Sequence, residues 1–326
     1  MTDTAINPKH SAIDQHLLLI DRFERAADGV VTLTLARESG GDLPAWTPGA
    51  HIDLVLSNGL TRQYSLCGDP SDRSRWRIGV LRAPASRGGS EYIHTRLKAG
   101  DKVRAVGPRN NFPLEPAERY LFIAGGIGIT PILPMLEYLS ATNAQWRLLY
   151  GGRSARSMAF LDEIRQLAGG VIEICPEDEY GLLDLDSCLS SHEPGHIVYC
   201  CGPEPLIAAV EHRCRLWPAG ALRKERFAAS ERTAPFDPGE FEVELARSGQ
   251  RVRVPADRTM LSVLEDAGCA ITNSCRAGIC GTCLVRVIAG TPDHLDDILD
   301  DQQREAGNVV LPCVSRSRTN TLVLDL

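Results

Sequence analysis

Apolar and polar residues alternate in short runs through the first third of the chain. The segments "VVTLTLA", "HIDLVLS" and "WRIGVLR" show this period of two, and turn-forming residues separate them. Successive side chains of a strand point to opposite faces, so this alternation is typical of half-buried antiparallel strands. We expect residues 1–115 to form a small antiparallel β-barrel, with residues 1–15 as a frayed tail.

The pattern changes after residues 107–119, "GPRNNFPLEPAER", a junction rich in proline. Continuous apolar runs, "RYLFIA", "WRLLYGG" and "HIVYCCG", then alternate with helical patterns such as "TPILPMLEYL". Uninterrupted apolar strands separated by helices are typical of a parallel sheet that is covered on both faces. We therefore expect residues 116–228 to form an α/β domain around a parallel sheet.

Alternation returns in "FEVELARSGQRVRVP", which predicts a hairpin around a Ser-Gly-Gln turn. The segment "TMLSVLEDAG" predicts a short helix that Thr259 caps and Gly268 ends. A loop rich in cysteine follows. This order is typical of a β-grasp ferredoxin, which we expect at residues 240–326 after a linker at residues 229–239. The expected fold is thus multidomain: a barrel, an α/β domain and a ferredoxin domain.

Composition narrows the classes of protein further. The chain has 326 residues, 43% of them hydrophobic, and a formal net charge of -7. A negative chain lacks the basic surface that nucleic acid requires, and no apolar run is long enough to cross a membrane. The 11 cysteines are an odd number at uneven spacings, which suits a reducing compartment better than a disulfide framework. We expect a cytoplasmic protein with no nucleic-acid or membrane partner.

The segment "SCRAGICGTC", residues 274–283, carries the most specific chemistry in the chain. Its three cysteines and one remote cysteine have the spacing of a plant-type [2Fe–2S] ferredoxin. Gly278 and Gly281 stand where the loop must bring its backbone close to the cluster. A zinc site is the alternative, but it usually pairs two short C-x2-C knuckles and only one is present. The expected metal ligands are Cys275, Cys280, Cys283 and Cys313.

Two strand ends in the α/β domain carry a nucleotide-binding pattern. In "RYLFIAGGIGITP" a buried strand runs into a glycine-rich turn and then a helix, where free amides and the helix dipole favour a pyrophosphate. The second strand ends in "CCGP", at the edge where parallel sheets bind ligands. For Cys201 a buried core position is an equally good interpretation. The candidates are Gly125, Gly126, Gly128, Thr130 as helix cap, Pro131, Cys201, Gly202 and Pro203.

The barrel carries a second pattern suited to an anionic, planar ligand. In "LTRQYSLCG" alternation places Arg62 and Tyr64 on one face of a strand, with Ser65 next to them, although an ordinary half-exposed strand would look the same. Downstream, "SRGGSEYIHTRL" predicts a helix start that can accept a phosphate. The residues of that start are Arg87, Gly88, Gly89 and Ser90.

The combination of motifs resembles the phthalate dioxygenase reductase family within the ferredoxin-NADP reductase superfamily. This family includes the reductase subunits of vanillate O-demethylases. The motifs are "RQYSL", "RGGS", "GGIGITP", "CGP" and "CRAGICGTC" with Cys313. The resemblance covers nearly the whole chain. It implies FMN in the barrel, a pyridine nucleotide in the α/β domain and a C-terminal [2Fe–2S] ferredoxin. No AMP-binding extension is evident, which favours FMN over FAD.

The same resemblance implies a role for each motif residue. Arg62, Tyr64 and Ser65 would contact the flavin, and the Arg87 to Ser90 segment would hold its phosphate. The turn from Gly125 to Pro131 would line the NADH site, with Cys201 near the nicotinamide and Phe227 close to the flavin. Arg153 and Arg156 stand where an arginine can accommodate a 2'-phosphate, so NADPH is the alternative to NADH.

The cofactors would carry the chemistry, so no side chain is expected to be catalytic. A pyridine nucleotide gives two electrons at once, whereas a [2Fe–2S] cluster accepts one at a time. A flavin between them would accept the pair and pass the electrons on singly. The resemblance implies a Rieske-type oxygenase component as the partner, acting on an aromatic acid or a related small substrate, and one chain could work as a monomer. An acidic segment, "PDHLDDILDDQQRE", could steer docking, or be a solvated helix face. The alternatives are an FAD-dependent electron-transfer subunit, such as that of dihydroorotate dehydrogenase, and a cluster-based redox sensor.

Overall fold

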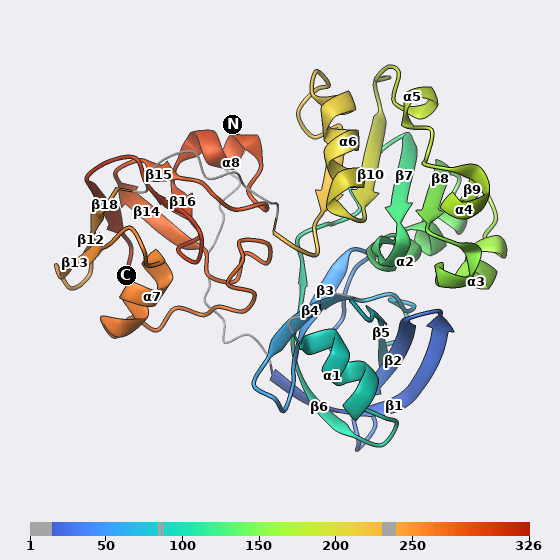
Figure 1. Ribbon diagram of the computed structural model, residues 1–326, viewed down its shortest axis with the longest axis horizontal. Coiled ribbons are helices and arrows are strands. Elements are labelled where there is room, and N and C mark those ends of the chain that lie inside the picture. The colour runs from blue at the N-terminus through green and yellow to red at the C-terminus, as the bar shows by residue number, and fades with distance from the viewer. Residues whose placement is uncertain (1–14, 84–85, 87, 230–238) are drawn as a thin grey trace.

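Three sheets divide the chain in the computed structural model, which describes residues 15–83, 86, 88–229 and 239–326 (Figure 1). An antiparallel barrel comes first, a parallel sheet with helices second, and a small mixed sheet last. The expected fold class is therefore confirmed. The expected tail and most of the expected linker lie outside the described residues.

The barrel is a six-stranded antiparallel sheet in the order β4-β3-β6-β1-β2-β5, and a bridge between Leu66 and Ile78 joins its two ends. Its core contains Leu33, Ile52 and Trp76, all fully buried, from the inward positions of the alternating runs. A short helix, α1 (Gly89–Arg96), lies between β5 and β6 in the chain. The strands are β1 (Gln15–Ala27), β2 (Val30–Ala36), β3 (Ala50–Val55), β4 (Thr61–Ser65), β5 (Arg75–Leu81) and β6 (Lys102–Asn110).

The second domain is a five-stranded parallel sheet in the order β11-β10-β7-β8-β9. Alternate residues of its strands enter two different cores, which is why the runs are continuously apolar. Helix α2 packs in one core and α6 in the other. The strands are β7 (Arg119–Gly125), β8 (Gln145–Gly152), β9 (Gly170–Pro176), β10 (His196–Cys201) and β11 (Leu222–Glu225). The helices are α2 (Ile129–Ser140), α3 (Leu161–Arg165), α4 (Glu177–Tyr180), α5 (Leu185–Cys188) and α6 (Glu204–Cys214), with 3-10 turns at Gly126–Gly128 and Ala155–Ser157.

The prediction that Thr130 caps α2 is wrong. The helix begins at Ile129, its N-cap is Gly128, and no side chain caps it. Thr130 is already inside the helix, where its hydroxyl donates to the carbonyl of Ile127 at 2.9 Å. A 3-10 turn brings the chain into the helix before Thr130, so the helix starts earlier than the capping preference indicated.

The C-terminal domain is a mixed sheet in the order β13-β12-β18-β14-β16, with a separate β15-β17 pair. Thr259 caps α7 as expected, because its side chain accepts from the backbone N–H of Ser262, and Gly268 follows the helix at φ +87°. The strands are β12 (Phe241–Leu245), β13 (Arg251–Val254), β14 (Val285–Ala289), β15 (Pro292–Asp293), β16 (Val309–Val310), β17 (Arg316–Ser317) and β18 (Thr321–Leu324), and the helices are α7 (Met260–Asp266) and α8 (Asp301–Ala306).

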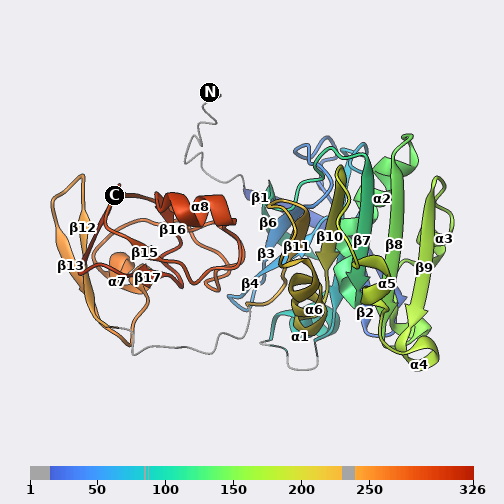
Figure 2. The same ribbon diagram turned by 90° about the horizontal axis from the view of Figure 1, so that it is seen from above.

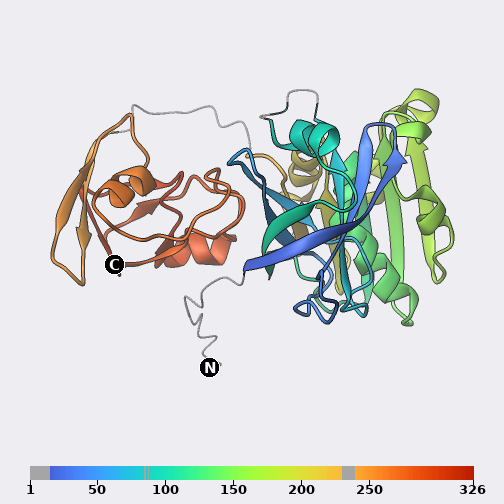
Figure 3. The same ribbon diagram turned by 90° about the horizontal axis from the view of Figure 1, so that it is seen from below.

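Figures 2 and 3 show the C-terminal domain to one side of the other two domains, and in Figure 1 the parallel sheet lies above the barrel. Arg77 of the barrel joins Glu163 of the parallel-sheet domain through two hydrogen bonds of 3.1 and 2.7 Å. Asn111, just after β6, contacts the C-terminal domain at Cys280. In the part of the chain that the structure describes, no helix has the length and apolar character needed to cross a membrane.

Candidate functional site

The loop of residues 274–283, here the cluster loop, carries three of the four candidate metal ligands, and the fourth, Cys313, follows β16. Cys275 hydrogen-bonds to Cys280, and Cys313 hydrogen-bonds to Cys283 and also interacts with Cys280. Three of the thiols are almost fully buried, and Cys275 is partly exposed. The hydrogen bond from Cys275 lowers the pKa of the Cys280 thiol, which favours the thiolate that a metal binds. Each of these two thiol pairs would supply the two protein ligands that one iron atom of a [2Fe–2S] cluster needs.

Both glycines of the cluster loop have the conformations that the sequence predicts. Gly278 has φ +73° and Gly281 has φ +69°, in the region that side chains disfavour. A Cβ atom on Gly278 would lie 2.7 Å from the side chain of Val314 and 3.1 Å from the Cα of Asp296. The loop is therefore shaped by its own glycines and by the segment that follows it.

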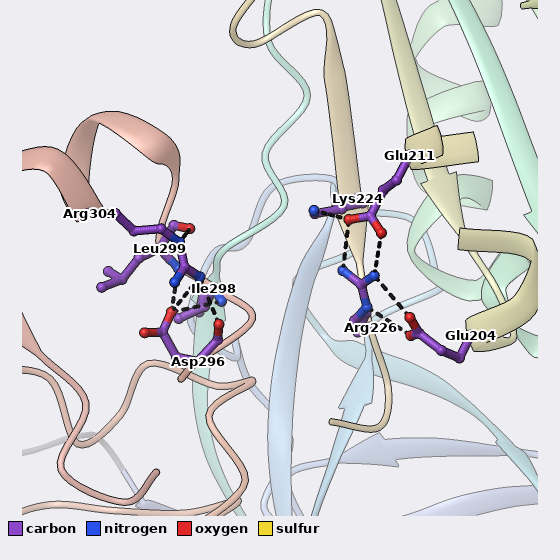
Figure 4. Close-up of polar contacts among 8 residues, drawn as sticks. All are labelled: Glu204, Glu211, Lys224, Arg226, Asp296, Ile298, Leu299 and Arg304. Atoms are coloured by element: carbon purple, nitrogen blue, oxygen red, sulfur yellow. Dashed lines mark hydrogen bonds and ion pairs between the residues drawn. The ribbon is translucent and has the colours of Figure 1, made fainter. Parts of the chain in front are cut away.

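Asp296, whose backbone packs against Gly278 of the cluster loop, has its side chain inside the domain (Figure 4). Its carboxylate is buried, accepts the backbone N–H groups of Ile298 and Leu299 at 3.2 and 2.9 Å, and pairs with Arg304 at 3.2 Å. The idea that Asp296 belongs to an acidic docking surface is therefore wrong, because a carboxylate that is buried and bound to its own domain cannot face a partner protein.

Other acids of that segment also have internal roles. Asp293 pairs with Arg318 at 2.9 Å, and the Asp300 side chain caps α8 by accepting from Gln303 at 2.8 Å. Asp301 and Glu305 are exposed, so any docking role of this segment narrows to its outer face.

The barrel motifs meet at the start of α1. A Cβ atom on Gly89 would lie 2.6 Å from the side chain of Arg62, so the glycine lets strand β4 and the helix start come together. Gly88 is the N-cap of α1 with φ +84°, and no side chain caps the helix. The Ser90 hydroxyl donates to the Ser86 hydroxyl at 3.0 Å. Arginine, free helix amides and small residues fit a phosphate group. Arg87 lies outside the described residues.

Tyr64 stands next to Arg62 on β4, half buried against the barrel core. Burial raises the pKa of its phenol well above the usual range, so the ring is neutral and suited to stacking. Ser65 is buried, and its hydroxyl donates to the Glu225 carboxylate at 3.3 Å.

Glu225 and three barrel residues form a buried polar group that the motifs did not indicate. His51 lies 4.0 Å from Glu225, and Arg109 pairs with Asp53 at 2.7 Å. Burial raises the pKa of Glu225 to about 8 and lowers that of His51 to about 3. Several buried atoms of this region lack a hydrogen-bond partner among the described residues, namely both ring nitrogens of His51, Oδ1 of Asp53 and Nε2 of Gln63. Buried polar atoms are normally paired, so this region fits a ligand with a polar edge, as a flavin has.

A cavity of about 810 Å³ opens where β7 and β10 end. A Cβ atom on Gly128 would lie 2.2 Å from the carbonyl oxygen of Cys201, and one on Gly125 would lie 2.6 Å from Pro203, so only glycine lets these two strand ends touch. The lining includes Gly125, Gly126, Gly128, Arg153, Gly202, Pro203 and Phe227. Among the described residues, Thr130, Pro131 and Cys201 stand outside this lining; the Cys201 thiol is fully buried in the core.

Arg226 holds the end of the domain, next to Phe227, against helix α6 (Figure 4). Its guanidinium, 7% exposed, donates to Glu204 at 2.8 and 3.1 Å and to Glu211 at 3.2 and 2.7 Å. Lys224 also pairs with Glu211. Two bidentate pairs fix the direction of an arginine more firmly than one ion pair does. Phe227, 42% exposed, is thereby kept at the cavity.

The two candidate nucleotide-selecting arginines differ in their surroundings. Arg156 pairs with Asp28 at 3.2 Å and is mostly exposed. Arg153 lines the cavity together with Glu177, the first residue of α4. The N–H of Asp178 donates to the carbonyl of Arg153 at 3.2 Å, which joins the two loops. Sequence reasoning missed Glu177, because the pairing of β8 with β9 brings the two loops together.

These sites define a class: an oxidoreductase with a nucleotide cavity, a barrel suited to a flavin and a [2Fe–2S] ferredoxin domain in one chain. Models of known families agree, since a 2Fe-2S iron-sulfur cluster binding domain matches residues 243–318 and an oxidoreductase NAD-binding domain matches residues 122–171. The vanillate O-demethylase oxidoreductase of Pseudomonas putida is 41% identical over 95% of this chain and 99% of its own length.

Solved structures extend the comparison. The structure of phthalate dioxygenase reductase, described as a modular structure for electron transfer from pyridine nucleotides to [2Fe–2S], is 35% identical with a TM-score of 0.69, over 98% of this chain and 100% of its own. An intact type IV self-sufficient cytochrome P450 monooxygenase is 40% identical with a TM-score of 0.89, over 96% of this chain, which spans 41% of that longer one. The chain belongs to the phthalate dioxygenase reductase family, as its motifs indicated.

Proposed function

We propose that this chain is the reductase component of an oxygenase system, taking electrons from NADH through FMN and its [2Fe–2S] cluster to a separate oxygenase. The observation that carries the proposal is the presence of all three sites in one chain: the Arg62–Gly89 cradle, the cavity at Gly125–Gly128 and the paired thiols of the cluster loop. The full-length similarity to reductases of oxygenase systems supports it.

The protein's part in this chemistry is binding and orientation. When bound, the flavin takes a hydride from the nicotinamide and gives up single electrons, which the cluster carries onward. Arg62 and the free amides of α1 would hold the FMN phosphate, and Tyr64 would cover the ring. The amides of the β7–α2 turn would hold the nucleotide pyrophosphate, and Phe227, held by Arg226, would shield the flavin face from water. The cysteine thiolates would hold the iron.

The partner is proposed to be an oxygenase of the Rieske type that acts on an aromatic acid or a related small substrate, as the named relatives suggest. A haem oxygenase is the second candidate. One observation favours it: the P450 monooxygenase structure contains a region that matches this chain with a TM-score of 0.89. The oxygenase, and not this chain, selects the substrate, so the two candidates differ in which partner accepts the electrons. Rates of reduction of a Rieske protein and of a P450 haem protein would separate them.

The test is an anaerobic stopped-flow experiment on the purified protein after its flavin has been extracted and identified. We expect FMN, flavin bleaching on mixing with NADH, and then loss of the cluster's visible absorbance. Extraction of FAD would move the protein toward the FAD-dependent alternative. A cluster that NADH never reduces would contradict the proposed function and favour a redox sensor.

Glu177 is expected to give the protein its preference for NADH. A carboxylate beside the adenosine ribose accepts hydrogen bonds from its hydroxyl groups and repels a 2'-phosphate, whereas an arginine attracts one. Since Glu177 and Arg153 line the same cavity, the substitution Glu177→Gln should raise kcat/KM for NADPH by about tenfold, equivalent to about 1.4 kcal/mol, with a smaller change for NADH.

Steady-state kinetics with both nucleotides would check this expectation. Glu179→Gln is the matched control, because Glu179 is an exposed residue of the same helix that does not line the cavity among the described residues. An unchanged NADPH to NADH ratio in the Glu177 variant would show that the carboxylate does not face the ribose.

A further inference from the structure

The barrel reaches the cluster loop through one side chain that no motif includes. The Nδ2 amide of Asn111 donates to the carbonyl oxygen of Cys280 at 3.0 Å, across 169 residues of sequence. Cys280 is one of the four candidate metal ligands and is 3% exposed. The contact therefore joins the backbone of a cluster ligand directly to the barrel.

Asn111 is held firmly on the barrel side. The preceding residue, Asn110, donates to the carbonyl and hydroxyl of Thr47 and to the carbonyl of Pro48, and its side-chain oxygen accepts from the N–H of Phe112 at 3.0 Å. Phe112 is buried, and its ring meets the ring of Tyr199 edge-on, with the two ring centroids 5.3 Å apart. With both neighbours anchored, the backbone at Asn111 is held in place, and its exposed side chain reaches across to Cys280.

The cluster loop is also held firmly at the point of contact. The residue after Cys280 is Gly281, with φ +69°, and a Cβ there would lie 3.1 Å from Ile298 and 3.9 Å from the Asn111 amide. Asp297 donates its N–H to the carbonyl of Gly278 at 2.9 Å. A side chain at Gly281 would thus push against Ile298 of the C-terminal domain and come into ordinary van der Waals contact with the Asn111 amide. In the part of the chain that the structure describes, the Asn111 contact joins two anchored segments and so restrains the distance between them.

We propose that Asn111 is a positioning residue that docks the cluster loop on the barrel and so sets the rate at which the cluster is reduced. The inference rests on the proposed function. A tethered domain that leaves its docked position lengthens the distance that an electron must cross, so the fraction of time spent docked limits the rate. Losing one hydrogen bond of ordinary strength lowers that fraction by up to about tenfold.

The substitutions Asn111→Asp and Asn111→Ala test the proposal in the full-length protein with its cofactors. Aspartate has the shape of asparagine but no N–H, so it places an acceptor against the Cys280 carbonyl. Asn143→Ala, at an exposed asparagine between α2 and β8, is the matched control. We expect amide hydrogen exchange in residues 276–284 to become faster in both Asn111 variants and to stay unchanged in the control.

In anaerobic stopped-flow experiments, flavin bleaching by NADH should keep its rate, and loss of the cluster absorbance should slow by about five- to tenfold. The cluster's midpoint potential and electron paramagnetic resonance spectrum should not change, because the contact is to a carbonyl and not to a sulfur. Unchanged exchange and cluster reduction in both variants would overturn the proposal, as would a shifted potential or loss of the cluster. If NADH fails to bleach the flavin of the unaltered protein, the proposed function fails instead.

Discussion

Replacing Cys313 with alanine is expected to remove the cluster and to lower reduction of cytochrome c by at least about 100-fold. Cys313 lies 30 residues after Cys283 in the sequence, and its thiol is buried and hydrogen-bonded to Cys283. Without it one iron would keep a single protein ligand, Cys283. Reduction of ferricyanide by NADH should persist, because the flavin and nucleotide sites lie in other domains.

The visible spectrum, the iron content and the two acceptor assays measure this outcome together. Cys269→Ala is the control, since Cys269 is a partly exposed thiol of the same domain that lies outside the cluster loop. A Cys313 variant that keeps its cluster and its cytochrome c activity would contradict the assignment of this residue as a ligand.

The sequence predicted features whose cause lies within a few residues. The spacing of the cluster cysteines, the glycines of tight turns and the Thr259 cap are local, because a thiolate, a positive φ or a free N–H needs a particular residue at one position. The period of two predicted the antiparallel barrel and the continuous apolar runs predicted the parallel sheet, because each pattern is also set by neighbouring residues. Thr130 is the exception: a local capping preference lost to a 3-10 turn that enters the helix earlier.

Features made by distant segments could not be predicted in this way. Ser65 meets Glu225 across 160 residues, and Asn111 meets Cys280 across 169. Asp296 stands in an acidic run that looks solvated, and only the fold turns it inward to the backbone of Leu299. Neither alternation nor spacing contains information on which strand ends become neighbours, so these residues are visible only in three dimensions.

The buried pair of Glu225 and His51 gives the protein a pH dependence of stability with a definite sign. Burial raises the pKa of Glu225 from 4.5 to about 8, so the folded state binds this proton more tightly and the free energy of unfolding falls as pH rises between those values. Burial lowers the pKa of His51 from 6.5 to about 3, so the unfolded state binds that proton more tightly and the free energy of unfolding rises with pH between those values.

Between pH 4.5 and 6.5 the two contributions oppose each other, and above 6.5 only that of Glu225 remains. Stability should therefore be greatest on a plateau between about pH 4.5 and 6.5 and fall by about 2 kcal/mol from there toward pH 8, since one pH unit corresponds to at most about 1.4 kcal/mol for one proton. The groups that face the pair are Ser65 and the Arg109–Asp53 ion pair. Urea unfolding at a series of pH values measures the effect.

The substitution Glu225→Gln should remove the decline above pH 6.5 and extend the rise up to that pH, whereas His51→Asn should remove the rise and start the decline near pH 4.5. Glu305→Gln, at an exposed acid of the C-terminal domain, should leave the whole profile unchanged. Glutamine preserves the hydrogen bond from Ser65 but has no proton to lose, so a decline that persists in the Glu225 variant would mean that another buried group titrates. A decline that disappears would show that folding the barrel against β11 holds Glu225 in its neutral form.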